Sequence, residues 1–206
     1  MRHGCALFTL LFIMGLSAWS QEPPKAEIFA GYSFVTAEFP ANPDPAAGKF
    51  RGSLNGWNAS ATFNVNRWLG AVADFGGYYG SPTKGTTFKP ANCVLCTGNA
   101  TATLHNMHTF AFGPQLSWRG DSLTAFAHTL FGGATIREDM DFFGPLPRIS
   151  NTSFAMIYGG GVDLSLSPRW IMRLQPDYFA TKVLDRRQNN FRVSAGLVFR
   201  LGVPKK

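Results

Sequence analysis

Two aspartates and two histidines are the residues whose types could support catalysis or metal binding in this chain. Asp74 and Asp163 could act as the acid and base of a hydrolase, because paired carboxylates serve that chemistry. The sequence places neither beside a cleft, so we interpret both as members of ion pairs inside the fold. His105 and His108 could bind a metal, but residues three apart on a strand point to opposite faces. We therefore predict no catalytic residue, no cofactor and no metal site.

The cysteines indicate an exported protein rather than redox or zinc chemistry. Cys93 and Cys96 form a Cys-Val-Leu-Cys motif. A zinc site would need a second pair of ligands and a redox site a βαβ context, and the sequence shows neither. Because disulfides persist in oxidising compartments, we predict a loop disulfide between Cys93 and Cys96, with two free thiols as the alternative.

The amino-terminal residues 1–20 have the three parts of a secretory signal peptide. Arg2 and His3 precede an apolar run over residues 6–16, and Ala18-Trp19-Ser20 supplies the small-x-small cleavage pattern. The run is too short for a membrane-spanning helix, which needs roughly 20 apolar residues. We predict a cleaved signal peptide over residues 1–20 and one domain over residues 21–206.

The composition argues against an ordinary soluble surface. Charged residues make up 15% of the chain, whereas soluble domains carry roughly 25%. The net charge of +7 could suggest nucleic acid, but the lysines and arginines are scattered and no basic helix gathers them. Affinity for an anionic surface is the milder inference, and we expect no nucleic-acid partner.

Eight segments alternate apolar and polar residues with period two, which is the pattern of β-strands. They are residues 27–35, two strands within 55–80, and residues 107–118, 123–136, 154–166, 170–179 and 190–201. The strand over 123–136 has no clear inward face, because Phe126, His128 and Leu130 fall on the same side. No amphipathic helix interrupts the strands.

The connections between these strands alternate strictly between short and long. Short turns are predicted at residues 66–68, 119–122 and 167–169, and long segments at 36–53, 80–106, 137–153 and 180–189. All long segments would thus lie at one end of an up-and-down sheet. Outer-membrane barrels have this asymmetry, with short periplasmic turns and long external loops.

The polar face of the strands decides between a membrane barrel and a soluble calyx. In the stretch 55–80, Trp57 and Phe63 share an apolar face, while Asn58 and Thr62 share the other. Small polar residues suit the narrow interior of an eight-stranded barrel, whereas a soluble strand usually exposes Lys, Glu and Arg. We predict an all-β fold, an eight-stranded antiparallel up-and-down transmembrane β-barrel; a soluble secreted lipocalin-like calyx is the alternative.

Two sets of residues follow from this fold. The charges on the polar face have both signs and predict a polar, ion-paired and plugged lumen, formed by Glu27, Asp74, Gln115, Asp163, Arg173, Asp177, Arg192 and Arg200. Aromatic residues near strand ends predict girdles at the two membrane interfaces, formed by Trp68, Tyr78, Tyr79, Trp118 and Trp170.

Several motifs carry a resemblance that covers most of the chain outside its loops. They are EIFAGYSF (27–34), GWNASATFNVNRWLGAVADFGGYYG (56–80), HTFAFGPQLSWR (108–119), AFAHTLFGGA (125–134), GGGVDLSLSPRW (159–170) and FRVSAGLVFRLG (191–202). In their order and spacing the chain resembles the small eight-stranded outer-membrane β-barrels of the porin family, which include the OmpA transmembrane domain and OmpX-like proteins.

The resemblance implies a location in the bacterial outer membrane and a non-enzymatic role. That role would be membrane integrity or surface interaction through four long external loops. Expected partners are outer-membrane lipid, lipopolysaccharide and the barrel-assembly machinery, and the protein would be a monomer. A narrow pore or a lipid-modifying enzyme is the alternative. A lipid A deacylase of this shape would need a serine near a histidine, and Thr129 and Leu130 follow His128 instead.

Overall fold

The structure, a computed structural model, describes residues 23–40, 49–80, 86–88, 100–141, 149–183 and 186–202. The predicted signal peptide and the predicted disulfide between Cys93 and Cys96 lie outside these residues. Every element in the described part of the chain is a β-strand, and no described helix has the length and apolar character needed to cross a membrane.

The described residues form nine strands, and all the pairings among them are antiparallel. Their bounds are β1 Ala26–Pro40, β2 Lys49–Asn64, β3 Leu69–Gly80, β4 Thr86–Phe88, β5 Ala100–Arg119, β6 Leu123–Asp141, β7 Ile149–Ser165, β8 Trp170–Val183 and β9 Arg186–Leu201. The three-residue strand β4 pairs only with β5 and lies outside the main cylinder.

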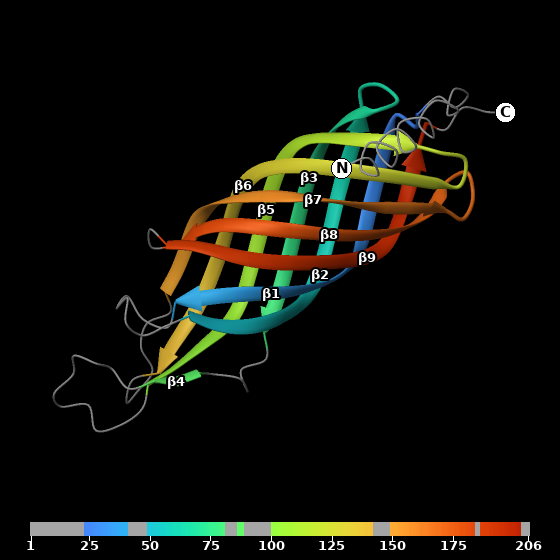
Figure 1. The fold of residues 1–206 in the computed structure, drawn as a ribbon. Coiled ribbons are helices and arrows are strands. Elements are labelled where there is room, and N and C mark those ends of the chain that lie inside the picture. The colour runs from blue at the N-terminus through green and yellow to red at the C-terminus, as the bar shows by residue number, and fades with distance from the viewer. Residues whose placement is uncertain are drawn as a thin grey trace, which may run out of the picture.

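The other eight strands close into a barrel (Figure 1). Each strand pairs with its neighbour in sequence, β1 pairs with β9, and the additional pairing of β3 with β5 completes the circle. A closed barrel leaves no strand edge, so every strand has a backbone partner on both sides. The predicted eight-stranded antiparallel up-and-down β-barrel is confirmed.

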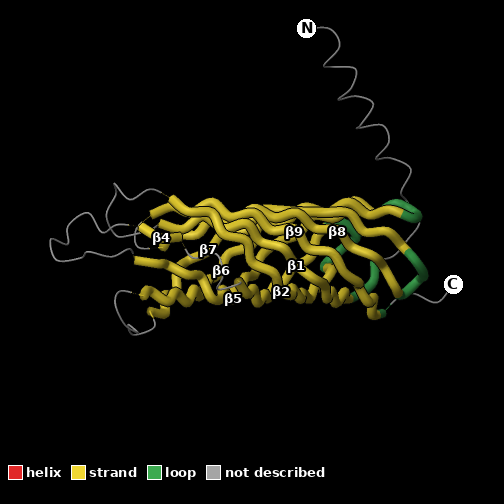
Figure 2. Tube along the Cα trace, turned by 90° about the horizontal axis from the view of Figure 1, so that it is seen from below, coloured by secondary structure: helices red, strands yellow, loops and turns green. Residues whose placement is uncertain are grey.

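The two ends of the barrel differ in their connections. Tight turns join β2 to β3, β5 to β6 and β7 to β8, and the described chain also begins and ends at this side, which we call the turn end (Figure 2). The connections that include residues 41–48, 81–99, 142–148 and 184–185 all leave from the opposite side, the loop end. The predicted positions of the short turns match the structure.

The strands extend farther toward the loop end than the sequence predicts. We expected a long loop over residues 180–189, but β8 and β9 stay paired up to Val183 and Arg186. Likewise β6 continues to Asp141, and β5 begins at Ala100. The extensions of β6, β8 and β9 mix polar and apolar residues without period two, so the alternation that reveals a strand between lipid and lumen is missing. Residues 100–104 of β5 do alternate, but mostly between alanine and threonine, which distinguish the two faces only weakly.

Side chains alternate between the two faces of the barrel wall. On β2, Trp57 and Phe63 face outward with 47% and 62% of their surface exposed, while Asn58 and Thr62 are buried inside. The outer face carries large apolar side chains on all eight strands of the cylinder. On β6 the structure resolves the ambiguous phase, because His128, like Phe126 and Leu130, is buried inside the barrel.

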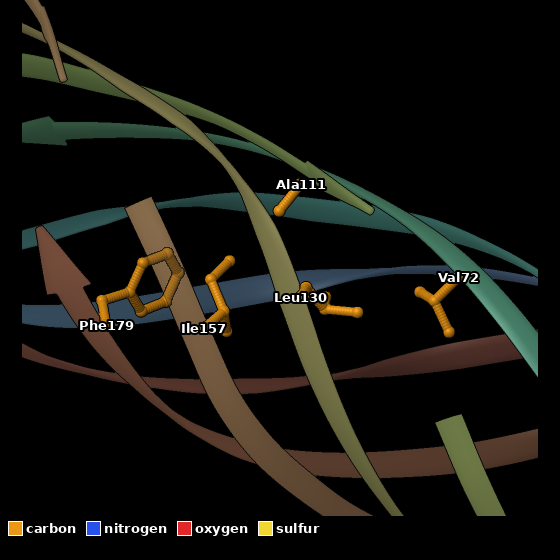
Figure 3. Packing of buried hydrophobic residues seen from close by; sticks show 5 residues of the cluster. All are labelled: Val72, Ala111, Leu130, Ile157 and Phe179. Carbon is orange, nitrogen blue, oxygen red and sulfur yellow. The ribbon is translucent and has the colours of Figure 1, made fainter. Parts of the chain in front are cut away.

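The interior also contains apolar side chains that the prediction of a polar lumen did not include. Figure 3 shows one cluster, formed by Val72, Ala111, Leu130, Ile157 and Phe179 from strands β3, β5, β6, β7 and β8. A second cluster joins Phe29, Ile171 and Val198. These are single apolar residues on an otherwise polar face, and the average character of that face does not indicate that they lie inside.

Candidate functional site: ion-pair clusters inside the barrel

One group of charges lies inside the barrel near the turn end, and we call it the turn-side cluster: Glu27, Arg119, Asp163, Arg173 and Arg200. Arg119 donates a hydrogen bond to the Glu27 carboxylate at 2.8 Å. Nitrogen atoms of Arg173 and Arg200 lie 3.6 and 3.7 Å from the same carboxylate. Glu27 therefore gathers three guanidinium groups from β5, β8 and β9.

Arg173 is the most deeply enclosed member of the turn-side cluster, with 1% of its surface exposed. It donates two hydrogen bonds to Asp163, at 2.7 and 2.8 Å, and the two residues face each other in the register of β7 and β8. Its guanidinium also lies over the Phe126 ring, 4.4 Å from the centroid. Bidentate pairing and ring stacking favour a charged arginine that is cut off from water.

A second group lies farther along the interior toward the loop end. We call it the loop-side cluster: Asn58, Asp74, Tyr78, His128, Gln175, Asp177 and Arg192. Arg192 is fully buried and is its centre. The guanidinium donates hydrogen bonds to Asp74 at 2.9 Å, to Asp177 at 2.8 Å and to the Tyr78 hydroxyl at 2.8 Å. Phe179 packs against the guanidinium, 4.7 Å from its ring centroid.

Neutral side chains complete the hydrogen bonding of the two aspartates. Asn58 donates to Asp74, and Gln175 donates to Asp177, both at 2.9 Å. His128 Nε2 lies 2.9 Å from the other oxygen of Asp177. A buried carboxylate needs such partners, because an unpaired charge in the interior is strongly unfavourable.

The contact between His128 and Asp177 spans an intervening strand. In the register of the sheet, His128 on β6 lies opposite Gly159 on β7, and Gly159 lies opposite Asp177 on β8. A Cβ atom at Gly159 would overlap the Asp177 carboxylate and lie only 2.8 Å from its carbon. Glycine at this position therefore leaves the space in which the imidazole meets the carboxylate.

The predicted lumen residues are all on the inner face, but they fall into different groups. Glu27, Asp163, Arg173 and Arg200 meet near the turn end, whereas Asp74, Asp177 and Arg192 meet farther in. Gln115 belongs to neither group, and its side-chain amide donates to the Ser117 hydroxyl at 3.2 Å.

The predicted lumen residues did not include four members of these clusters, Arg119, His128, Gln175 and Tyr78. Arg119 shares the inner face of β5 with Gln115 and Ser117, so period two could have identified it. The sequence assigns His128 to neither face, because its strand shows no clear phase. In the structure it is buried on the inner face together with Phe126 and Leu130.

Tyr78 is a correction, because the prediction that it belongs to an aromatic girdle is wrong. Its side chain is fully buried and its hydroxyl binds Arg192. Adjacent residues on a strand point to opposite faces, so Tyr78 and Tyr79 could not both lie outside. Of the other predicted girdle residues, Trp68, Trp118, Trp170 and Tyr79 have 63%, 59%, 48% and 47% of their surface exposed.

The remaining candidates for chemistry do not form a reactive centre. His108 is on the outer face, where its Nε2 lies 3.5 Å from the Tyr79 hydroxyl. Within the described residues, no group of three or more histidine, cysteine and acidic side chains is arranged to hold a metal. His128 pairs with Asp177, and its Nδ1 has no hydrogen-bond partner, so in the described part of the chain no serine, threonine or cysteine pairs with the imidazole as a nucleophile.

Together the two clusters take side chains from all eight strands of the barrel. The turn-side cluster joins β1, β5, β7, β8 and β9, and the loop-side cluster joins β2, β3, β6, β8 and β9. Charge-assisted hydrogen bonds across the interior connect strands that are not neighbours in the wall. This arrangement can hold the cylinder in shape and occupy the space along its axis.

The family model described as the outer membrane protein beta-barrel domain matches residues 5–199. Among solved structures, the chain is similar to Ail, the attachment invasion locus protein of Yersinia pestis, in complex with the heparin analogue sucrose octasulfate. The identity is 15%, the TM-score is 0.52, and the match covers 86% of this chain and 99% of that chain. Neisserial surface protein A is 13% identical with a TM-score of 0.57, covering 86% and 97%. No curated protein matches the sequence.

Proposed function

Because this chain belongs to the outer membrane protein beta-barrel domain family, and so lies in the bacterial outer membrane, we propose that it is a non-enzymatic barrel with a closed lumen. Its work would be membrane integrity or surface interaction through the long external loops. The tight turns would face the periplasm and the loop end the outside, as in other bacterial barrels. We further propose that it acts as a monomer, surrounded by outer-membrane lipid and lipopolysaccharide after insertion by the barrel-assembly machinery.

The filled interior is the observation that carries the proposal of a closed lumen. Both clusters are buried, and apolar side chains such as Leu130 and Phe179 occupy further space between the walls. An eight-stranded barrel is just wide enough for its interior to be filled by side chains. Opening a path for ions would require breaking several charge-assisted hydrogen bonds at once, which favours a structural role over that of a pore.

The surroundings of His128 support the proposal that the protein is not an enzyme. A lipid-modifying enzyme needs its reactive group on the surface that meets lipid, but His128 is buried inside the barrel and bound to Asp177. Expression of the protein should therefore leave the mass of lipid A unchanged. A shifted lipid A mass that depends on His128 would favour the enzyme instead.

The proposal of surface interaction rests on the architecture of the loop end. There β5 begins at Ala100, β6 ends at Asp141 and β7 begins at Ile149, and long segments of the sequence connect the strands at this end. The similar protein from Yersinia pestis is named for attachment and invasion and was solved with a heparin analogue. Sulfated polysaccharide is therefore a reasonable first ligand to test for this chain.

The experiment uses cells that lack the protein and carry either the wild-type chain, a variant with residues 89–99 replaced by a short glycine-serine linker, or Arg173→Met. Retention on immobilised heparin and leakage of a periplasmic marker are measured for each. We expect the linker variant to lose retention, while Arg173→Met keeps it wherever the barrel is assembled. If the linker variant behaves as the wild type in both assays, the proposed role of this loop is wrong.

A further inference from the structure

Two turns at the periplasmic rim combine an arginine with an exposed tryptophan. Arg67 precedes Trp68 in the turn between β2 and β3, and Arg169 precedes Trp170 in the turn between β7 and β8. The tryptophans have 63% and 48% of their surface exposed on the outside of the barrel. Trp118 adds a third exposed ring beside the first turn, because the Ser117 amide donates to the Trp68 carbonyl at 2.8 Å.

Both turns are fixed by the same pattern of hydrogen bonds. In the first, the amides of Val65 and Asn66 donate to the Leu69 carbonyl, and in the second those of Leu166 and Ser167 donate to Trp170. A side-chain oxygen then holds the amide that follows the arginine. Asn66 Oδ1 accepts from Trp68 at 2.9 Å, and Ser167 Oγ accepts from Trp170 at 3.1 Å. The backbone around each arginine is therefore ordered before any ligand arrives.

The two arginines differ from the other described arginines at this end of the barrel. Arg119 and Arg200 point inward to Glu27. In contrast, neither Arg67 nor Arg169 has a side-chain hydrogen bond or ion pair within the described ranges, and both reach solvent. They are thus available for an anion that comes from outside the protein.

The two turns lie on opposite sides of the rim. Around the closed sheet the order is β3, β2, β1, β9, β8, β7, β6 and β5, so the β2–β3 turn and the β7–β8 turn are separated by half of the circle in either direction. The third turn, between β5 and β6, carries Asp121 instead of an arginine. Within the described residues the rim therefore has two separate turns that carry an arginine, and the exposed Lys25 before β1 is a further cation between them on one side.

We propose that these two turns bind the phosphate groups of anionic phospholipids in the periplasmic leaflet. Exposed tryptophans place the turns at the headgroup level, where indole rings partition. A guanidinium at that level can donate two parallel hydrogen bonds to a phosphate. Each basic residue near an anionic lipid surface strengthens the attraction by roughly fivefold. The proposal requires the barrel to lie in the membrane, but it does not require a closed lumen.

The test measures lipid selectivity in phosphatidylcholine vesicles. Purified full-length protein is refolded into them, and electron paramagnetic resonance of spin-labelled phosphatidylglycerol and spin-labelled phosphatidylcholine gives the relative association constant of the two lipids. The variant is Arg67→Gln with Arg169→Gln. The matched control, Arg51→Gln with Arg187→Gln, removes the same charge from strands β2 and β9 toward the loop end. The heat-dependent mobility of each protein in SDS verifies folding.

We expect the wild type and the control to select phosphatidylglycerol several-fold, and the rim variant to lose most of this preference. Replacing both rim arginines by lysine should preserve part of it, because the charge remains while the paired donors are lost. Equal selectivity in the rim variant and the control, or none in the wild type, would overturn the proposal. Loss of selectivity on adding millimolar inorganic phosphate at constant ionic strength would indicate a site for free phosphate instead of lipid.

Discussion

Arg192 is the side chain on which the loop-side cluster depends. Its guanidinium is fully buried and donates hydrogen bonds to both Asp74 and Asp177. Replacing Arg192 by methionine would leave two carboxylates without their cation, and breaking a buried ion pair in this way destabilises a protein by about 3–5 kcal/mol. Urea unfolding in vesicles of zwitterionic lipid measures the loss. As the control, Arg169→Met removes an exposed arginine and should change stability by less than about 0.5 kcal/mol; equal losses in both variants would contradict this role of Arg192.

Substitution of Gly159 should also lower the stability of the barrel, although this residue contributes no side chain. In Gly159→Ala the new methyl group would overlap the Asp177 carboxylate and push it away from His128. Overpacking of this kind destabilises a core by about 1–3 kcal/mol. The same substitution in an Asp177→Ala background should have a smaller effect, because the clashing carboxylate is gone, although the close contact with the Pro176 carbonyl oxygen, at 2.8 Å, remains. Two equal effects, measured by urea unfolding, would show that Gly159 acts independently of Asp177.

At the residue scale, the sequence predicts which side chains face inward better than it predicts their partners. Period two places Asp74 and Arg192 inside the barrel. It cannot show that they meet, because the two residues are 118 positions apart in the sequence and their contact depends on how the barrel closes. Tyr78 is the opposite case, since the period alone would have placed it inside, and its aromatic character led to the wrong assignment.

The exposed apolar side chains on the outside of the barrel form a belt, and we expect a charged residue to be tolerated less well at the centre of this belt than at its edge. On β2, Ala61 lies among the outward-facing apolar residues. Val65 follows the last residue of β2 and lies in the turn. Arginine at the middle of a membrane barrel destabilises it by about 2–4 kcal/mol, but near the interface by only about 0–1 kcal/mol. We therefore expect Ala61→Arg to lower stability well below that of Val65→Arg in a urea titration. The reverse order would place the membrane elsewhere along the strands.

At the element scale, the sequence predicts strands only where two environments meet. Between lipid and lumen the strands must alternate, so β8 is evident from Trp170 to Phe179. Beyond that point the same strand continues to Val183 with no pattern, because outside the belt neither face has to be apolar. Backbone pairing alone maintains the ladder there, and pairing leaves no trace in the order of residues.

At the scale of the whole molecule, two buried clusters and the apolar side chains around them occupy the interior of a barrel that is narrow to begin with. The number of strands and the closure followed from the sequence, because eight alternating segments with alternating loop lengths have few other solutions. The filling did not, because it depends on which inward side chains meet across the interior, as Arg119 meets Glu27, and the register of all the strands decides those contacts.

The conductance of the purified, refolded protein in a planar lipid bilayer tests the closed lumen most directly. A lumen closed by the turn-side and loop-side clusters predicts no steady current for the wild type at moderate voltage. A steady open-channel current through the wild type, abolished by replacing Arg173 or Arg192, would contradict it, because those arginines would then line a conducting path rather than close one.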